Sequence, residues 1–322
     1  MMHQISANLD GYECFFTPYY ADGLINFVAN KGFLGNTILG GKFRKNTERY
    51  LANNNLRIDY RGIGNDYDLV YTCSDLIIPK NIRNKKIILV QEGMTDPETV
   101  MFYLVKYLKL PRWLASTSPT GISNQYGLFC VASEGYRDLF LRKGAKEEKI
   151  VVTGIPNFDN AKQYLKNDFP HKNYVLVATS DTRETLKYEN RKKFIRECVE
   201  ITNGRQLIFK LHPNENIERA TQEINKYAPG ALIFTNVNIN YMIANCDVLI
   251  TKYSSVVYIG LALGKEVHSA FDIDELKCLM PIQNNGASAE RIARIGKHLL
   301  EAPNITLAEI HLVYDNKLML LR

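Results

Sequence analysis

Two segments of this sequence decide the fold: Phe209-Lys210-Leu211-His212-Pro213-Asn214 and Cys246-Asp247-Val248-Leu249-Ile250-Thr251-Lys252-Tyr253-Ser254-Ser255. In each, an apolar run of strand length ends and polar side chains follow at once. Open parallel sheets collect their ligands at the carboxyl ends of their strands. We therefore expect an anion site at a sheet edge, with a nucleotide diphosphate or monophosphate as the favoured ligand.

Apolar runs of strand length alternate with runs of helical periodicity along the chain. The expected strands are residues 67–72, 86–90, 128–132, 149–153, 174–178, 206–211, 231–234, 248–251 and 266–269. The expected helices are residues 44–55, 136–143, 189–201, 217–227, 240–244 and 256–263. Alternation at this spacing predicts parallel sheets covered by helices, the doubly wound α/β class.

Length and a polar break predict two domains. The chain has 322 residues, and single hydrophobic cores stop growing near roughly 250 to 300 residues. Residues 166–172, which include Pro170, have the composition of a linker. We expect one Rossmann-like domain over residues 1–165 and a second over 173–322, with a ligand cleft between their facing sheet edges.

The composition is that of an ordinary globular protein, with 46% hydrophobic and 23% charged residues and a net charge of +6. Most of its basic runs predict solvated faces, although they would also suit anionic lipid headgroups or an anionic substrate, and nucleic acid is disfavoured. The six cysteines form no metal-binding pattern, and no metal site is expected. No secretory signal or apolar run of ~18 residues is present, so a cytoplasmic location is expected.

Two further stretches have competing interpretations. The glycines Gly35, Gly40 and Gly41 with Lys42 could cradle a phosphate, but the stretch lacks the ending of a P-loop and is typical of turns. Residues 104–114, with the single tryptophan Trp113, could lie on a membrane surface as an amphipathic segment. The favoured interpretation is that this stripe packs against its own domain.

On the carboxyl side of the chain, the candidate ligand-binding residues follow predicted strands. Ser254 and Ser255 lie between a strand and an apolar helix, where hydroxyls and helix N–H groups favour an anion, and Lys252 would add positive charge. A plain serine helix cap is the alternative. His212, held by the rigid Pro213, could donate to phosphate oxygens, whereas a lone histidine is more often structural.

On the amino side, the strand at 86–90 ends in Gln91-Glu92-Gly93-Met94-Thr95-Asp96. A carboxylate directly after a buried strand, followed by a glycine, can face a ligand cleft. Glu92 could equally be an exposed turn residue. Asp96, which precedes Pro97, is expected to cap a helix.

Together these motifs resemble the GT-B enzymes of bacterial surface-polysaccharide assembly. The resemblance rests on Leu211-His212-Pro213, Tyr253-Ser254-Ser255 and Leu263-Gly264-Lys265-Glu266-Val267, with Val90-Gln91-Glu92-Gly93 and Val151-Val152-Thr153-Gly154-Ile155-Pro156-Asn157-Phe158-Asp159 in the first half. The group includes sialyl- and Kdo-transferases with HP and SS motifs, CDP-glycerol glycerophosphotransferases and UDP-N-acetylglucosamine 2-epimerases.

The resemblance implies a metal-independent inverting glycosyltransferase without a cofactor, which uses a CMP-, UDP- or CDP-activated donor. The acceptor would be a saccharide or a lipid-linked chain of a capsule or lipopolysaccharide, which leaves association with the inner face of the membrane open. Glu92 would be the general base, and His212, Ser254 and Ser255 would bind the donor phosphate. The remaining candidates are Lys210, Pro213, Thr179, Ser180, Arg183 and Lys252 on the donor side, and Gly93, Asp96 and Asn157 on the acceptor or cleft side.

The sequence also departs from this group. Epimerases carry a histidine in the loop after the first carboxyl-domain strand, whereas the loop here is Thr179-Ser180-Asp181-Thr182-Arg183-Glu184. This departure disfavours epimerisation. Arg183 or Thr182 could contact the donor, or the turn could simply cap a helix. Besides transfer, a 2-epimerase, a glycerophosphotransferase and a non-catalytic nucleotide-sugar-binding subunit remain open.

Overall fold

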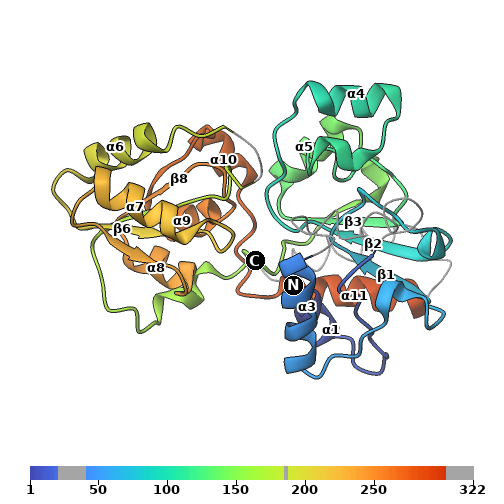
Figure 1. Ribbon diagram of the computed structural model, residues 1–322. Helices are drawn as coiled ribbons and strands as arrows, with labels where there is room; N and C mark the ends of the chain where they lie inside the picture. The colour runs from blue at the N-terminus through green and yellow to red at the C-terminus, as the bar shows by residue number, and fades with distance from the viewer. Residues whose placement is uncertain (21–40, 185–187, 302–322) are drawn as a thin grey trace. The chain divides into compact units, whose positions relative to one another are not determined.

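The computed structural model of the protein describes residues 1–20, 41–184 and 188–301. Of the glycine stretch, Gly35 and Gly40 lie outside these residues, and Gly41 is the first residue of α3 (Gly41–Asn53). The chain divides into two compact units (Figure 1). The first contains Met1–Pro156 and the segment that begins at Ala287, and the second contains Asn157–Gly286.

The first unit is built on a parallel sheet of four strands in the order β1-β2-β3-β4. The strands are β1 (Leu69–Thr72), β2 (Lys86–Val90), β3 (Leu128–Val131) and β4 (Ile150–Val152). The helices are α1 (Met2–Ser6), α3, α4 (Val100–Leu108), α5 (Glu134–Lys143) and α11 (Ser288–Glu301), with short 3-10 turns η1 (Tyr60–Gly62), η2 (Lys80–Ile82), η3 (Arg112–Ala115) and η4 (Glu147–Lys149). Continuous apolar runs form β2 and β3 because both of their faces are buried.

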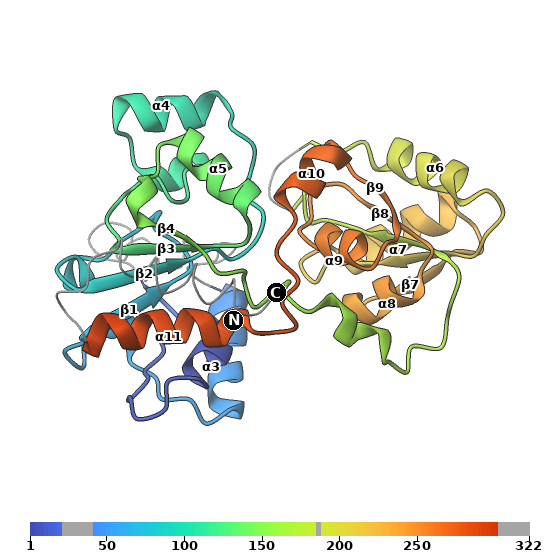
Figure 2. The same cartoon turned by 180° about the vertical axis from the view of Figure 1, so that it is seen from behind.

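One core of this unit lies between the sheet and α11. Ile88 and Leu128 of the sheet pack with Ile292 and Ile295 of α11, and Ile5 of α1 joins them. Figure 2 shows α11 running alongside β1 at the face of this sheet. A segment that follows the whole second unit in sequence is therefore part of the first unit.

The second unit is built on a parallel sheet of five strands in the order β7-β6-β5-β8-β9. The strands are β5 (Val175–Ala178), β6 (Leu207–Lys210), β7 (Leu232–Phe234), β8 (Val248–Thr251) and β9 (Glu266–His268). The helices are α6 (Arg191–Thr202), α7 (Ile217–Tyr227), α8 (Ile239–Asn245), α9 (Val257–Ala262) and α10 (Ile273–Leu279), with a 3-10 turn η5 (Ala161–Leu165). The strand order reverses at β5, which makes it the switch point of a doubly wound sheet.

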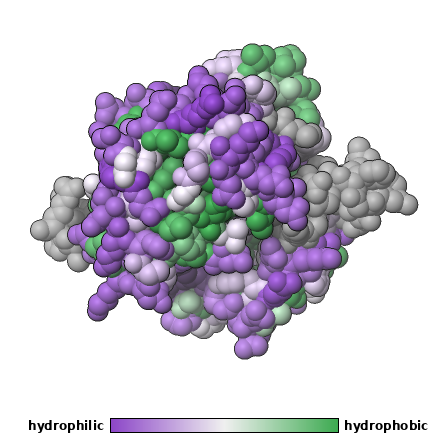
Figure 3. Space-filling model, turned by 60° about the vertical axis from the view of Figure 1, so that its left-hand side comes forward, coloured by the Kyte–Doolittle hydropathy of each residue, from purple (hydrophilic) through white to green (hydrophobic). Residues whose placement is uncertain are grey.

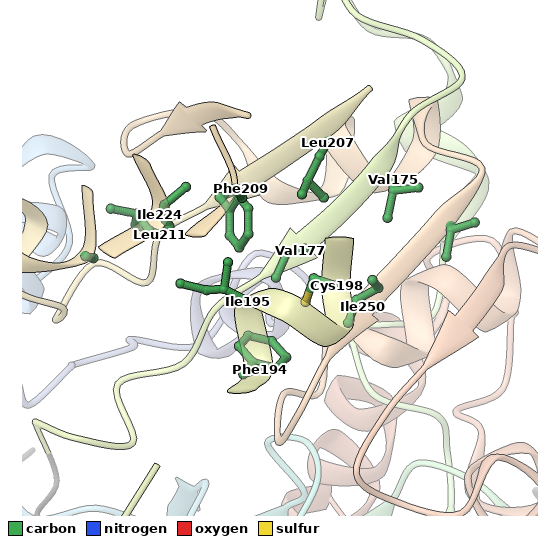
Figure 4. Packing of buried hydrophobic residues seen from close by; sticks show 13 residues of the cluster. Val175, Val177, Phe194, Ile195, Cys198, Leu207, Phe209, Leu211, Ile224 and Ile250 are labelled. Atoms are coloured by element: carbon green, nitrogen blue, oxygen red, sulfur yellow. The ribbon is translucent and has the colours of Figure 1, made fainter. Parts of the chain in front are cut away.

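Side chains of α6 fill the core on one face of this sheet. Figure 4 shows Ile195 and Cys198 of α6 against Val177 and Phe209 of the strands, and all four side chains are fully buried. Asn190 caps α6 by accepting a hydrogen bond from the Lys193 amide at 3.0 Å. The cap fixes where α6 starts, directly after the loop that leaves β5.

The predicted α/β class and the nine predicted strands are confirmed, and the strand ends agree to within two residues. The division of the chain differs from the predicted one. The units meet at Pro156 and Asn157 rather than in residues 166–172, and α11 belongs to the first unit rather than to the second. Residues 157–165 therefore belong with the second sheet.

One local prediction in the first unit is wrong, and another holds only in part. Asp96 does not cap α4, because the N-cap residue is Thr99 and the Asp96 carboxylate instead accepts from Ser116 Oγ at 2.6 Å and Thr117 Oγ1 at 2.8 Å. The stripe at 104–114 packs against its own unit only in part. Val105 is buried, but Trp113 and Leu114 are exposed among the described residues.

Candidate functional site

Three loops leave the second sheet at the same level of its carboxyl edge. Ala178, the last residue of β5, pairs in register with Lys210 of β6 and with Thr251 of β8. The residues that follow are therefore neighbours: Thr179 after β5, Leu211 and His212 after β6, and Lys252 after β8. This edge, at the switch point of the sheet, is the place where doubly wound sheets bind ligands.

The loop after β6 is held in place by hydrogen bonds that its backbone amides donate to side chains. The His212 amide donates to Thr179 Oγ1 at 3.0 Å and to Glu215 Oε2 at 2.9 Å. The Asn214 amide donates to His212 Nδ1 at 3.3 Å, which makes Nδ1 the acceptor and assigns the ring proton to Nε2. Asp181 Oδ2 lies 3.7 Å from Nδ1 and would pair with it on protonation. The half-exposed imidazole thus has an N–H available for donation.

A chain of buried charges connects the three loops, and no motif in the sequence predicted it. The Glu215 carboxylate bonds Thr179 Oγ1 and pairs with Arg191 at the start of α6. Arg191 Nε lies 3.1 Å from Glu189 Oε2, and Lys252 Nζ lies 3.3 Å from Glu189 Oε1. The side chains of Glu189 and Glu215 are almost fully buried. Local polarity predicts exposure for such residues, so only tertiary structure reveals their pairing.

Several predicted donor-side residues have internal partners. Lys210 Nζ donates to the Leu211 carbonyl at 2.8 Å and the Thr235 carbonyl at 2.9 Å, and burial lowers its pKa. Arg183 forms a two-pronged pair with Glu223, with both distances 2.8 Å. Ser180 Oγ lies 2.7 Å from Thr182 Oγ1. Through these contacts the side chains hold the loops at the sheet edge in place, and the charges of Lys210 and Arg183 are directed to internal partners.

The serine pair does not begin the helix that follows it. The N-cap residue of α9 is Val256, which has no side-chain cap, and α9 has six residues. Ser254 Oγ accepts from the Val256 amide at 3.5 Å. Both serines are half-buried, and exposed Tyr253 precedes them. Of the groups predicted to bind an anion here, the two hydroxyls are the ones that remain, because a helix this short has a weak dipole.

In the first unit, Glu92 follows β2 at the carboxyl edge of the sheet. The buried Gln91 braces this position, because its side chain accepts from the Ala132 amide at 2.9 Å and donates to the Gly93 carbonyl at 2.9 Å. Glu92 itself reaches solvent. The protein around it still desolvates the carboxylate and raises its pKa, and the Met1 amino group partly offsets this effect. A pKa raised in this way is typical of carboxylates that accept protons in catalysis.

The segment after Glu92 is tied to a buried lysine that the sequence did not single out. Lys143 Nζ donates to Thr95 Oγ1 and to the Ser118 carbonyl, both at 3.1 Å. Burial lowers the pKa of Lys143 to about 8. Gly93 is half-buried. Asn157, the first residue of the second unit, is exposed.

A surface hollow of about 480 Å³ lies between the start of α6 and the side of α7, and its lining includes Arg183, Glu189 and Lys226. His212 and the serine pair do not line it. Within residues 1–20, 41–184 and 188–301, no group of three His, Cys, Asp or Glu side chains could hold a metal ion. In the same residues, none of the helices has the length and hydrophobicity needed to cross a membrane.

No protein-family model and no curated protein matches the sequence. Solved structures do match the fold. The UDP-GlcNAc 2-epimerase from Neisseria meningitidis bound to UDP-GlcNAc aligns with a TM-score of 0.50 at 12% identity, over 81% of this chain and 82% of that one.

Further matches have TM-scores below 0.5, and two of them serve as examples. They are the UDP-GlcNAc 2-epimerase from Methanocaldococcus jannaschii, with 0.47 at 14% identity over 79% of this chain and 90% of that one, and the wall teichoic acid polymerase TagF, with 0.48 at 12% identity over 76% and 78%. With its four-stranded and five-stranded parallel sheets, the chain has the two Rossmann-like domains of the GT-B fold.

Proposed function

We propose that this protein is an inverting glycosyltransferase that moves a sugar from a nucleotide-activated donor to a hydroxyl of a saccharide or lipid-linked acceptor in surface-polymer synthesis. One observation carries the proposal. Thr179, His212 and Lys252 follow three adjacent strands at the switch point of one parallel sheet, and one buried network holds all three loops. A phosphate at this edge would meet an imidazole, hydroxyls and a lysine.

On the donor side, the expected role of His212 is to donate its Nε2 hydrogen to a phosphate oxygen of the leaving nucleotide. Ser254 and Ser255 would donate their hydroxyls to the same group. Lys252 is already paired with Glu189. Its positive charge would attract the phosphate electrostatically from a distance as well as by direct contact. Fixed donors of this kind stabilise charge that develops on a leaving group.

On the acceptor side, Glu92 would take the proton of the attacking hydroxyl. The hydroxyl oxygen forms a bond to the anomeric carbon as the bond to the nucleotide phosphate breaks, which inverts the configuration. The proton ends on the Glu92 carboxylate and the negative charge on the nucleotide. The raised pKa of Glu92 makes it a better proton acceptor than an ordinary glutamate.

The proposal is tested with CMP-, UDP- and CDP-activated sugars offered together with acceptor glycans. Donor consumption that depends on acceptor would support transfer, and no donor binding or consumption across the panel would sink it. Glu92→Gln should abolish turnover and leave nucleotide binding largely intact. Glu98→Gln, an exposed acid six positions further on, is the matched control and should leave turnover unchanged.

A 2-epimerase acting on a UDP-sugar is the second candidate, favoured by the fold match to a UDP-GlcNAc 2-epimerase. The absence of a histidine from Thr179–Glu184 disfavours it. Deuterium incorporated from heavy water at the sugar carbon, without acceptor, would assign epimerisation. Transfer of glycerol phosphate from CDP-glycerol would assign the glycerophosphotransferase reaction, and tight nucleotide binding without any turnover would assign a binding subunit.

A further inference from the structure

The helix α4 is apolar on the side that faces away from its unit. Val100, Tyr103, Leu104, Tyr107 and Leu108 recur at the spacing of one helical face, and all five are exposed. Val100 is 76% exposed, Tyr107 71% and Leu108 63%. Figure 3 shows hydrophobic atoms gathered at the upper edge of that view, at the height of α4 in Figure 1.

The inner side of α4 is apolar as well. Phe102 and Val105 are buried, so the helix has no polar face apart from Lys106. A helix that is apolar all round is normally covered on every side. With nine residues α4 is too short to cross a membrane. The outward face of α4 therefore calls for a partner that covers only this side of the helix.

The turn after α4 extends the same surface. Lys109 ends the helix in the left-handed conformation, with φ of 55°. The chain then folds back through η3, where Trp113 is 46% and Leu114 42% exposed. We call α4 and residues 109–114 together the α4 surface. Contiguous exposed apolar surface of this kind marks an interaction site in soluble proteins.

The charges on the α4 surface favour lipid over protein. Exposed Lys109 and half-buried Lys106, whose ammonium lies over the Phe102 and Tyr107 rings, carry the positive charge of this surface. Arg112 in the turn is half-buried and donates to the Asp75 carbonyl at 2.9 Å. Two acids precede α4: Glu98 accepts a hydrogen bond from Tyr103 at 3.2 Å, and Asp96 is bonded by Ser116 and Thr117. Protein interfaces are depleted of lysine at their centres. Tyrosine, tryptophan and lysine beside leucine and valine are instead typical of segments that lie in the headgroup region of a bilayer.

We propose that the α4 surface docks the protein on an anionic membrane interface, with Tyr107, Leu108 and Trp113 in the headgroup and upper acyl region and the lysines on lipid phosphates. The amino-acid pattern of residues 104–114 favours packing of this stripe within its own domain. The exposure of its outward face changes that preference. Membrane docking by this surface is independent of the proposed function, because its test measures lipid binding alone.

The single tryptophan of the chain makes the first measurement possible without any mutation. Trp113 fluorescence should shift to shorter wavelength when vesicles of phosphatidylcholine and phosphatidylglycerol are added to the full chain. Vesicles of phosphatidylcholine alone should give a smaller shift, because the lysines lose their anionic partners. An unchanged emission spectrum with both vesicles would overturn the proposal.

The second measurement is co-sedimentation of variants with the same vesicles. The triple variant Val100→Gln, Tyr107→Gln, Leu108→Gln should lose most of the binding. Its matched control changes three exposed apolar side chains elsewhere, Ile63→Gln, Leu165→Gln and Val199→Gln, and should bind like the unchanged protein. Equal binding by both variants would contradict the proposal.

The electrostatic part is tested by Lys106→Gln with Lys109→Gln. Binding to anionic vesicles should weaken by roughly thirtyfold, since each basic residue contributes about 1 kcal/mol near such a surface. The control is Lys193→Gln with Lys277→Gln, which removes two exposed charges elsewhere. If the α4 surface instead mediates dimerisation, sedimentation equilibrium will show a dimer that the triple variant dissociates, and the membrane proposal fails.

Discussion

At the scale of single residues, Glu92 combines access to solvent with a carboxylate that is costly to ionise. Desolvation raises its pKa above the ordinary 4.5. A general base must be ionised, so kcat/KM should fall as the pH drops through this raised pKa, at a higher pH than an unperturbed glutamate would give. The pH profile of kcat/KM measures this limb. A limb at the ordinary glutamate value would remove Glu92 from the base role.

His212 allows its two ring nitrogens to be tested separately. Nδ1 accepts from the Asn214 amide, which leaves the Nε2 hydrogen for a phosphate. Glutamine places its amide near Nε2, whereas asparagine reaches only the position of Nδ1. We expect His212→Asn to lower kcat by about 100-fold, in the range seen when one oxyanion donor is removed, and His212→Gln to lower it much less. The reverse order would assign the active role to Nδ1 and Asp181.

Single residues were predictable from sequence where their position in a strand pattern was enough. Glu92 and His212 both follow buried apolar runs, and the structure has both at sheet edges. Asp96 was expected to cap a helix, and a helix cap was the alternative for the serine pair, but the N-cap residues are Thr99 and Val256. Capping depends on backbone angles at one residue, and a polar residue near a helix start fits several alternatives.

At the scale of elements, the buried charge network holds the loops after β5, β6 and β8 in register. Glu215→Gln should lower the free energy of unfolding of the second unit by about 3 kcal/mol, because it breaks a buried ion pair and leaves Arg191 with Glu189 as its remaining partner. The exposed Glu218→Gln, on the following helix, should change it by less than about 0.5 kcal/mol. Urea unfolding compares the two variants.

Loss of the Glu215–Arg191 pair should also weaken donor binding. If the network positions His212 and Lys252, Glu215→Gln raises the KM for the donor more than it lowers kcat, and Glu218→Gln leaves both unchanged. A destabilised Glu215→Gln protein with an unchanged donor KM would confine the network to a structural role.

Close packing of helices on each sheet gives a second prediction at this scale. A Cβ at Gly296 of α11 would collide with the Tyr71 hydroxyl and lie 2.9 Å from Leu69 Cδ2, and a Cβ at Gly260 of α9 would lie 2.8 Å from Leu249 Cδ2. Ala gains roughly 1 kcal/mol of helix propensity over Gly, but overpacking costs about 1–3 kcal/mol. Both Ala variants should therefore lower the melting temperature. A rise for Gly296→Ala would show that α11 does not press on β1.

The strands were predictable because buried parallel strands are continuous apolar runs in the sequence. The partners of α11 were not. Its pattern is helical, but local periodicity does not specify which sheet a helix packs on. Ala289, Ile292 and Ile295 would suit either core, and only the folded chain assigns them to the sheet of the first unit. The domain boundary predicted at 166–172 differs from the observed one for the same reason: local composition does not specify which sheet the neighbouring residues pack on.

At the scale of the whole molecule, the return of α11 makes the first unit discontinuous, and this can be tested by truncation. A chain that stops at Gly286 retains the whole second unit but loses Ala289, Ile292 and Ile295 from the core of the first. We expect the first unit to unfold and the second to keep a cooperative transition, because its own core is intact.

Hydrogen exchange measures the two units separately: protection of backbone amides should vanish in β2 and β3 and persist in β5 and β8. Adding back residues 287–322 as a separate chain should restore protection in β2 and β3. If protection in the first sheet survives truncation without that addition, α11 is not needed for the first unit to fold. The domain division predicted from the linker composition would then describe the chain better than the division at Pro156 and Asn157.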